Sequence, residues 1–153
     1  MSRLQVTTTA GRGAGLEEAA VRELRASMRG QVLLAGDAGY DDARELWNAM
    51  IDKKPALIAR CAGAEDVIRC VDFARAYDLL VSVRGGDHSA AGNALCDGGL
   101  TIDLSPMNKV SVDPAQRTAR AGGGSRWGDF DRATQAFGLA TTGGTNSDTG
   151  VGG

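Results

Sequence analysis

The stretch Val81-Ser-Val-Arg-Gly-Gly-Asp-His-Ser-Ala-Ala-Gly92 decides how this chain is interpreted. An apolar run over residues 79–83 leads into it and predicts a buried strand. The chain then turns through Arg84 and two glycines to reach His88, the single histidine. Glycine lets a ligand approach the backbone, and successive N–H groups in such a loop can form an anion-binding nest. The loop therefore predicts a site for a phosphorylated ligand beside an imidazole.

The segments before this loop predict an α/β sheet, with the loop at the carboxyl end of its strands. Apolar runs at residues 56–61 and 79–83 flank a helical pattern at residues 64–77, so a strand–helix–strand unit is expected. The helix is expected to bury a face made of Val67, Ile68, Val71 and Ala74. In open α/β sheets ligands bind beyond the carboxyl ends of the strands, which is where the His88 loop would lie.

The N-terminal quarter is expected to be simpler. Residues 1–15 are polar and rich in glycine and are expected to be mobile. Residues 16–29 predict a helix with an apolar face, and a short strand is expected at residues 31–35. Asp41 or Asp42 is expected to cap a helical turn that ends between residues 47 and 50.

Beyond the His88 loop the pattern predicts further strands and one helix. A strand is expected at residues 100–104, and a hairpin is expected around Asp113-Pro-Ala-Gln116. Ser125 is expected to cap a helix that runs to about Phe137, and Leu139-Ala140 to form a short strand. The chain then ends in a second loop of glycines and small polar residues, so we expect it to be part of a longer protein.

Composition excludes several classes of protein. The 153 residues predict one domain or two small lobes. A net charge of −2 and a pI near 5.4 argue against a nucleic-acid partner. No apolar run approaches the roughly 20 residues that span a bilayer, and a signal-peptide core is absent, so a cytoplasmic location is expected. The three cysteines, Cys61, Cys70 and Cys96, have no CxxC spacing and are expected to be buried thiols.

Five segments in order carry a resemblance to a known family. They are Val83-Arg-Gly-Gly-Asp-His-Ser-Ala-Ala-Gly92, Gly98-Gly-Leu-Thr-Ile-Asp-Leu-Ser-Pro-Met-Asn108, Ala121-Gly-Gly-Gly-Ser-Arg-Trp-Gly-Asp129, Gly138-Leu139 and Gly143-Gly-Thr-Asn-Ser-Asp-Thr-Gly-Val-Gly-Gly153. Together they resemble the FAD-binding domain of the vanillyl-alcohol-oxidase/PCMH flavoproteins, and most closely the branch like berberine bridge enzyme and 6-hydroxynicotine oxidase. The resemblance implies an α+β, PCMH-type domain of two small α/β lobes, truncated at its C-terminal end. Residues 1–30 would be a lead and helix, and residues 31–153 the incomplete FAD-binding domain.

The resemblance also implies a cofactor site. His88 matches the histidine that bonds covalently to the 8α-methyl carbon of the flavin. The two glycine-rich loops would hold the pyrophosphate and pass close to the flavin ring. The implied FAD-binding residues are Arg84, Gly85, Gly86, Asp87, His88, Ser89 and Gly92 in the first loop, and Gly143, Gly144, Thr145, Ser147, Asp148, Thr149, Gly150, Gly152 and Gly153 in the second.

The chain departs from the family pattern at two positions. Asp87 stands where glycine is common, and its charge beside a pyrophosphate is unfavourable unless it faces solvent or pairs with Arg84. Arg84 itself is therefore either a phosphate contact or the ion-pair partner of Asp87. Doubly attached members carry a cysteine near the position of Asn146, so a single covalent link is the most that we expect here.

The resemblance implies an FAD-linked oxidoreductase that takes a hydride from a small organic substrate, with oxygen as the usual acceptor. Neither a substrate site nor a catalytic base is identifiable, so whether this chain alone is an enzyme stays open, as does its oligomeric state. One alternative is a truncated, non-catalytic flavin- or nucleotide-binding fragment. Another, an NAD-type Rossmann protein, is disfavoured because Gly11-Arg-Gly-Ala-Gly15 lacks the third glycine of the fingerprint.

Overall fold

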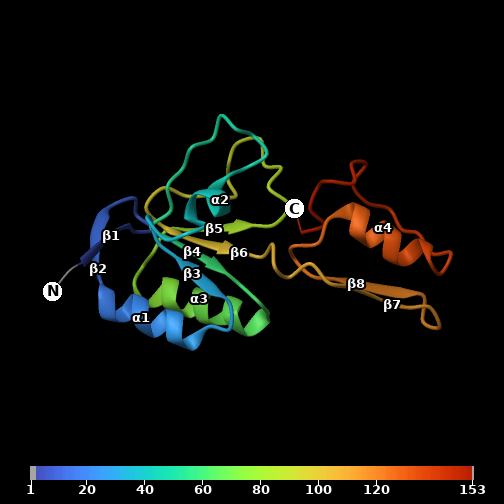
Figure 1. Cartoon of the computed structure of the whole chain (residues 1–153), viewed down its shortest axis with the longest axis horizontal. Helices are drawn as coiled ribbons and strands as arrows, with labels where there is room; N and C mark the ends of the chain where they lie inside the picture. The colour runs from blue at the N-terminus through green and yellow to red at the C-terminus, as the bar shows by residue number, and fades with distance from the viewer. Residues whose placement is uncertain (1–2, 153) are drawn as a thin grey trace.

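The computed structural model describes residues 3–152, which form two lobes (Figure 1). The first lobe holds the strands β1 (Arg3–Thr7), β2 (Gly13–Glu17), β3 (Gln31–Leu33), β4 (Leu57–Arg60), β5 (Val81–Arg84) and β6 (Leu100–Asp103), and the helices α1 (Glu18–Ser27), α2 (Tyr40–Arg44) and α3 (Ala64–Ala76). The second lobe holds β7 (Val110–Asp113), β8 (Thr118–Ala121) and α4 (Trp127–Gln135). This arrangement confirms the predicted α+β fold of two small lobes.

A four-stranded sheet in the order β3-β4-β6-β5 organises the first lobe. β4, β6 and β5 are parallel, and β3 runs antiparallel to β4. The predicted strand–helix–strand unit is present, but its two strands are separated by β6. β4 begins with an apolar run, residues 57–59, because both of its faces are covered, and β6 is buried throughout although it includes Thr101 and Asp103. β5 was predicted to be buried, but it is an edge strand that exposes Val81 and Val83. The His88 loop follows this edge strand at the carboxyl end of the sheet.

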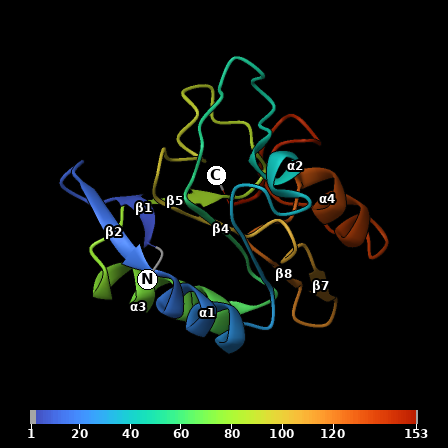
Figure 2. The same cartoon turned by 60° about the vertical axis from the view of Figure 1, so that its left-hand side comes forward.

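The main core lies between the sheet and two helices. α1 and α3 lie side by side on one face (Figure 2), and α2 lies on the other. Leu24 and Met28 at the end of α1 pack in the same cluster as Leu57 of β4, Ile102 of β6 and Cys70 of α3. All three cysteines are buried free thiols, as expected. No helix within residues 3–152 is long and apolar enough to cross a membrane.

A first correction concerns the N-terminus. Residues 1–15 were expected to be mobile, but β1 and β2 form an antiparallel hairpin. Val6 and Leu16, one on each strand, are buried in the main core. The hairpin is also bonded to the rest of the lobe, because Leu80 donates to the carbonyl of Thr7 at 2.9 Å. Glycine-rich composition concealed an alternation in which these two apolar residues point inward.

The second correction concerns the buried face of α3. Ile68 and Val71 were expected in the core, yet they are 60% and 42% exposed. Ala74 is buried as expected and Val67 packs against the core. Asp66 and Cys70 are the buried residues that the prediction missed, and they share one face with Ala74 at i, i+4 spacing. The Asp66 carboxylate accepts hydrogen bonds from the backbone N–H groups of Arg29, Gly30 and Ala62, each at 2.9 Å. These bonds fix the rotation of the helix and leave two apolar side chains outside.

The third correction concerns the second lobe. The predicted hairpin is confirmed as β7 and β8, and a helix follows it. Ser125 does not cap this helix, since the N-cap position is Arg126 and makes no side-chain bond. The hydroxyl of Ser125 is buried and has no partner among the described residues. Leu139-Ala140 is not a strand.

A further correction concerns α2 in the first lobe. This helix is shorter than expected and ends at Arg44, and its N-cap residue is Gly39 and not an aspartate.

Candidate functional site

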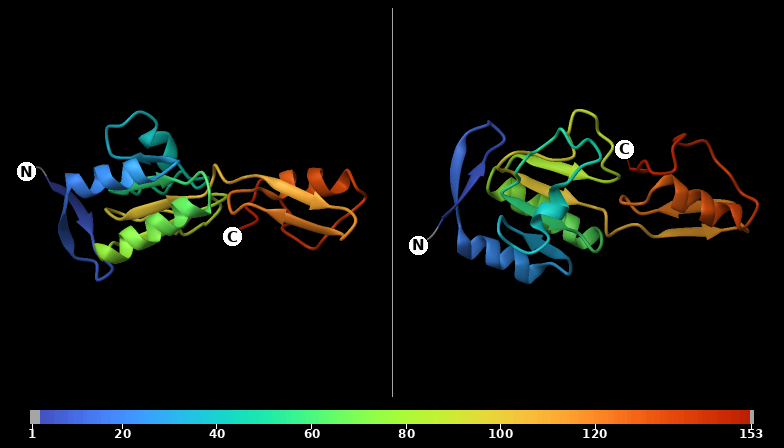
Figure 3. Two further views of the ribbon diagram at one scale, coloured as in Figure 1. Left: turned by 90° about the horizontal axis from the view of Figure 1, so that it is seen from below. Right: turned by 45° about the horizontal axis from the view of Figure 1, so that its top comes forward.

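Three glycine-rich loops meet where the two lobes join: residues 84–92, 122–124 and 149–152. A Cβ built on Gly86 would lie 2.2 Å from the backbone N of Gly150, closer than real side chains approach. A Cβ on Gly152 would lie 2.8 Å from the carbonyl O of Gly123, and one on Gly85 would lie 3.2 Å from the same atom. Figure 3 shows the C-terminal segment returning from the second lobe toward the first. Only glycine lets these backbones come so close.

The first loop presents backbone donors that the protein leaves free. Within the described part of the chain, no acceptor is bonded to the N–H groups of residues 86–89 or of Gly123. Neighbouring residues are paired: Gly92 donates to the carbonyl of Ser89 at 3.0 Å, and Gly124 to that of Met107 at 3.1 Å. Clustered free N–H groups are strong hydrogen-bonding groups that suit an anion.

Arg84 and Asp87 form an ion pair within the first loop. The guanidinium donates through Nε at 2.6 Å and through Nη2 at 2.8 Å to the two carboxylate oxygens of Asp87. Both side chains are mostly buried, and Arg84 also donates to the carbonyl of Ala43. Of the two roles considered for Arg84, the structure therefore shows the ion pair. The pair also neutralises the negative charge that Asp87 would otherwise place beside an anion.

His88 lies half-buried at the end of this turn. Its ring stacks on the indole of Trp47, with ring centroids 5.1 Å apart and planes inclined by 24°. Among residues 3–152 no hydrogen bond engages the ring nitrogens of His88. Trp47 was expected only at the end of a helical turn, and its contact with His88 could not be predicted because no local sequence pattern connects the two residues.

The C-terminal glycine-rich loop, which begins at Gly143, lies only partly at this site. Thr149 and Gly150 lie against it, and Val151 donates to the carbonyl of Ser125 at 2.9 Å. The segment 143–148 is exposed on the second lobe, where the backbones of Gly143 and Gly144 pack on the ring of Trp127. Thr145, Ser147 and Asp148 have exposed side chains that do not reach the His88 loop in this structure. Gly153 lies outside the described residues.

Asp103 closes the carboxyl end of β6 beside this site. It is 1% exposed, and its carboxylate accepts from the backbone N–H of Ser105 at 2.9 Å and from Arg60 Nε at 3.3 Å. Asp103 thus ends the strand and accepts a backbone hydrogen bond just beyond it. A hollow of about 170 Å³ lies here, lined partly by Arg60, Arg84 and Ser105.

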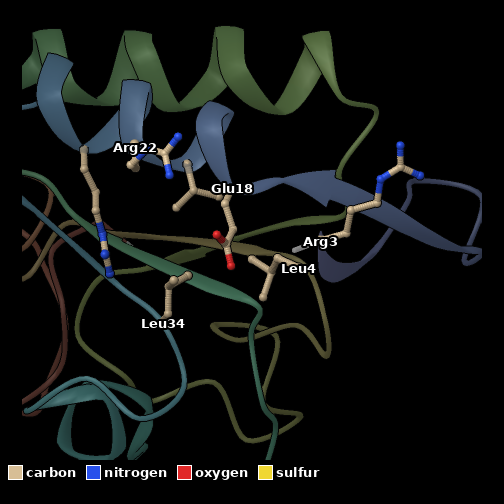
Figure 4. A pocket seen from close by; sticks show the side chains of 7 residues that line it. Arg3, Leu4, Glu18, Arg22 and Leu34 are labelled. Atoms are coloured by element: carbon tan, nitrogen blue, oxygen red, sulfur yellow. The ribbon is translucent and has the colours of Figure 1, made fainter. Parts of the chain in front are cut away.

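A larger hollow lies elsewhere on the first lobe. It measures about 350 Å³ and is lined by Arg3, Leu4, Glu18, Val21, Arg22, Arg25 and Leu34 (Figure 4). None of these residues was predicted to bind a ligand, and β1 and α1 lie on the side of the lobe away from α4 (Figure 1). Residues 3–152 also contain no group of His, Cys, Asp and Glu side chains that could hold a metal ion.

Comparison with known proteins decides the family. Residues 55–153 match the FAD binding domain family, which covers all three loops of the site. This chain belongs to that FAD binding domain family. It lies in the branch of the vanillyl-alcohol-oxidase/PCMH flavoproteins that includes the enzymes like berberine bridge enzyme, as the resemblance implied.

Relatives of this FAD binding domain include named oxidoreductases. The domain is 39% identical over 124 residues to (R)-6-hydroxynicotine oxidase from Paenarthrobacter nicotinovorans, covering 81% of this chain and 27% of the relative. It is 36% identical over 145 residues to the FAD-linked oxidoreductase pgmH from Aspergillus terreus, covering 92% of this chain and 29% of that protein.

Solved structures agree with the family assignment. The crystal structure of 6-hydroxy-D-nicotine oxidase from Arthrobacter nicotinovorans matches with a TM-score of 0.79 and 38% identity, over 82% of this chain and 28% of that one. The berberine-bridge-enzyme-like protein 1 of Physcomitrella patens matches with a TM-score of 0.77 and 25% identity, over 86% and 29% of the two chains. The chain thus spans between a quarter and a third of the length of these relatives.

The residues of the site fit FAD. A pyrophosphate is an anion, and the N–H groups of residues 86–89, for which the described residues supply no acceptor, are suited to bind one. The one acidic side chain in the turn is neutralised by Arg84. The ring nitrogens of His88 are unoccupied by described residues, so they are available to a cofactor.

Proposed function

We propose that this chain is the FAD-binding portion of an oxidoreductase that oxidises a small organic substrate by hydride transfer to the flavin. Molecular oxygen is the proposed acceptor, and His88 is the proposed point of covalent attachment. The name of a similar protein supports oxidation of a small organic substrate, because (R)-6-hydroxynicotine oxidase is 39% identical over most of this chain. The flavin supplies the redox chemistry, and the protein supplies binding and orientation.

The observation that carries the proposal is the meeting of the three glycine loops beside His88. Residues 86–89 offer free backbone donors, and Gly86 lies in backbone contact with Gly150. In the proposed complex these donors hold the pyrophosphate, and the adjacent imidazole is placed to bond to the flavin. Attachment would replace the imidazole N–H and a C–H of the 8α-methyl group by an N–C bond, and the two electrons and two protons left on the flavin would pass to the proposed oxygen acceptor. Neutral imidazole is a nucleophile near neutral pH, which suits His88 to that role.

The test is the intact mass of the protein, produced with ample riboflavin and measured under denaturing conditions. We expect a mass excess equal to one FAD, and peptide fragmentation should place it on His88. His88→Ala should lose the covalent flavin while still binding FAD reversibly, since the backbone nest is unchanged.

Two outcomes would contradict the proposal in different ways. Acid-stable flavin in His88→Ala would show that another residue is the attachment site. A wild-type protein with neither covalent nor reversibly bound flavin would favour the alternative, a fragment that does not function as a flavin-binding unit.

A further inference from the structure

The segment of residues 43–54 holds the His88 loop from one side. The amide of Asn48 donates to the carbonyl of Ala90 at 3.0 Å. The ammonium of Lys53 donates to the carbonyls of Gly92 and Leu95 at 2.8 and 3.1 Å. Two side chains from one segment therefore bind three carbonyls of the other, which ties the two stretches together at several points.

Packing adds to these bonds. Gly92 has a φ of +69°, and a Cβ at this position would lie 2.7 Å from Cγ2 of Ile51. Leu46 of the 43–54 segment is buried with Ala94 and Leu95, and Ile51 packs against this small cluster. The 43–54 segment is thus fixed against the loop on both sides of Trp47, even though the Trp47 side chain itself is 71% exposed.

The stack on Trp47 is the interaction that orients the His88 ring. The two planes are nearly parallel, at 24°, with centroids 5.1 Å apart. Because no described residue bonds to the ring nitrogens, no hydrogen bond within residues 3–152 sets the direction of the imidazole. The indole covers a face of the ring and leaves both nitrogens at its edge free to react.

We propose that Trp47 is a positioning residue for His88, which holds the imidazole in one plane before FAD arrives. This inference rests on the proposed attachment of FAD to His88. Trp47 itself takes no part in bond formation. Stacked aromatic pairs can bias an orientation by about threefold to tenfold. We therefore expect Trp47→Leu to slow covalent attachment by about threefold to tenfold, and Trp47→Phe to keep most of the wild-type rate.

The stack can be tested first in the protein without its cofactor. His88 is the only histidine, so its two ring C–H protons can be identified by NMR in the intact apoprotein without a full assignment. In the wild type the Trp47 ring current should displace these resonances from their positions in an unstructured peptide. Trp47→Leu should return them toward those positions, whereas Phe137→Leu should leave them in place. Phe137 is a matched control because it is an exposed aromatic on the other lobe, 52% exposed.

The second experiment measures attachment. Apoprotein prepared under riboflavin limitation is mixed with FAD, and acid-stable flavin is followed with time in the wild type, Trp47→Leu, Trp47→Phe and Phe137→Leu. Reversible FAD affinity is measured separately for His88→Ala and for His88→Ala combined with Trp47→Leu. A positioning role predicts a slower covalent step with less than twofold change in reversible affinity. General damage to the loop would weaken reversible affinity as well.

The outcomes separate this inference from the proposed function. If Trp47→Leu and the wild type attach FAD at the same rate, or if their histidine resonances coincide, the positioning role is wrong and the attachment site stands. A loss of reversible affinity in the double variant equal to the loss of rate would also overturn it. If the wild type gains no acid-stable flavin, the proposed attachment fails and this inference fails with it. Should Trp47→Leu not fold, the wild-type resonances decide, and wild-type resonances at unstructured positions would overturn the stack.

Discussion

The ion pair of Arg84 and Asp87 explains how an acidic residue can occupy a turn that faces an anion. Asp87 has a φ of +67°, a left-handed conformation that asparagine also tolerates. Asp87→Asn therefore removes the charge without changing the backbone, and it leaves a mostly buried guanidinium unpaired. We expect the free energy of unfolding to fall by about 3 kcal/mol, measured by denaturant titration.

A second ion pair in the chain provides the matched control. Asp129 and Arg132 also lie three residues apart, 3.1 Å from each other, but their side chains are 46% and 79% exposed. Asp129→Asn should cost less than about 1 kcal/mol, since solvent screens exposed pairs. Equal effects of the two substitutions would show that burial does not strengthen the Arg84 pair.

At the scale of elements, Asp66 links α3 to two loops of the first lobe. Burial raises the pKa of its carboxyl, but the bonds from the backbone N–H groups of Arg29, Ala62 and Gly30 outweigh burial and hold the pKa below its usual range. A carboxylate with a lowered pKa stabilises the fold at pH values above its unfolded pKa, about 4, and loses that contribution as pH falls through the lower folded value.

Asp66→Asn should therefore destabilise the protein at neutral pH by about 1–3 kcal/mol, because buried donors lose their charged acceptor. The difference between the variant and the wild type should begin to shrink as pH falls below about 4, the pKa of the unfolded state, and should be small below the lower pKa of the folded state, where the wild-type carboxylate is also protonated. Glu65→Gln, at an exposed position in the same helical turn, should change stability by less than about 0.5 kcal/mol. Denaturant titrations between neutral and acidic pH measure both, and a difference that grows in acid would contradict this account.

The elements differ in how well sequence predicts them, for physical reasons. β4 is covered on both faces, so residues 57–59 form an apolar run that the local sequence pattern identifies. The β7–β8 hairpin was also predictable, because Asp113-Pro marks its turn. The rotation of α3 about its axis was not predictable. It depends on hydrogen bonds from the backbone N–H groups of Arg29 and Gly30 to the buried Asp66, and these residues lie far from Asp66 in the sequence.

At the scale of the whole molecule, the two lobes meet through backbone rather than side chains. Gly86 of the first lobe lies against Gly150 of the second, and a methyl group at Gly86 would fall 2.2 Å from the backbone N of Gly150 and 2.4 Å from its Cα. Gly86→Ala must therefore push the two loops apart. We expect a loss of about 1–3 kcal/mol in the free energy of unfolding.

The same substitution should weaken reversible FAD binding, which can be measured by flavin fluorescence in the His88→Ala background. Gly13→Ala is the control, since nothing lies within 4 Å of a Cβ built at that position in the N-terminal hairpin. It should leave both quantities nearly unchanged. If Gly86→Ala were as harmless as Gly13→Ala, the close approach of the lobes would have no energetic importance.

The site shows what the sequence could indicate at this largest scale. The order of its glycine segments was sufficient to predict the family. It did not predict that the loop of residues 122–124 would meet the first loop. It left open two roles for Arg84, of which the structure shows one. It missed Trp47, because the contact with His88 joins segments that no periodicity relates. It also could not show that the backbones of Gly143 and Gly144 pack on Trp127.

The place of β6 between β4 and β5 has a consequence for biosynthesis. As the chain leaves the ribosome, β4, α3 and β5 emerge before the strand that joins them, so neither parallel pairing can form until residue 103 is outside the exit tunnel. The loop that carries His88 follows β5, so it also emerges before β5 has a strand to pair with. Its contact with Gly150 must wait until residue 150 has been synthesised, well after β6. The approach of the two glycine loops therefore forms later than the parallel sheet.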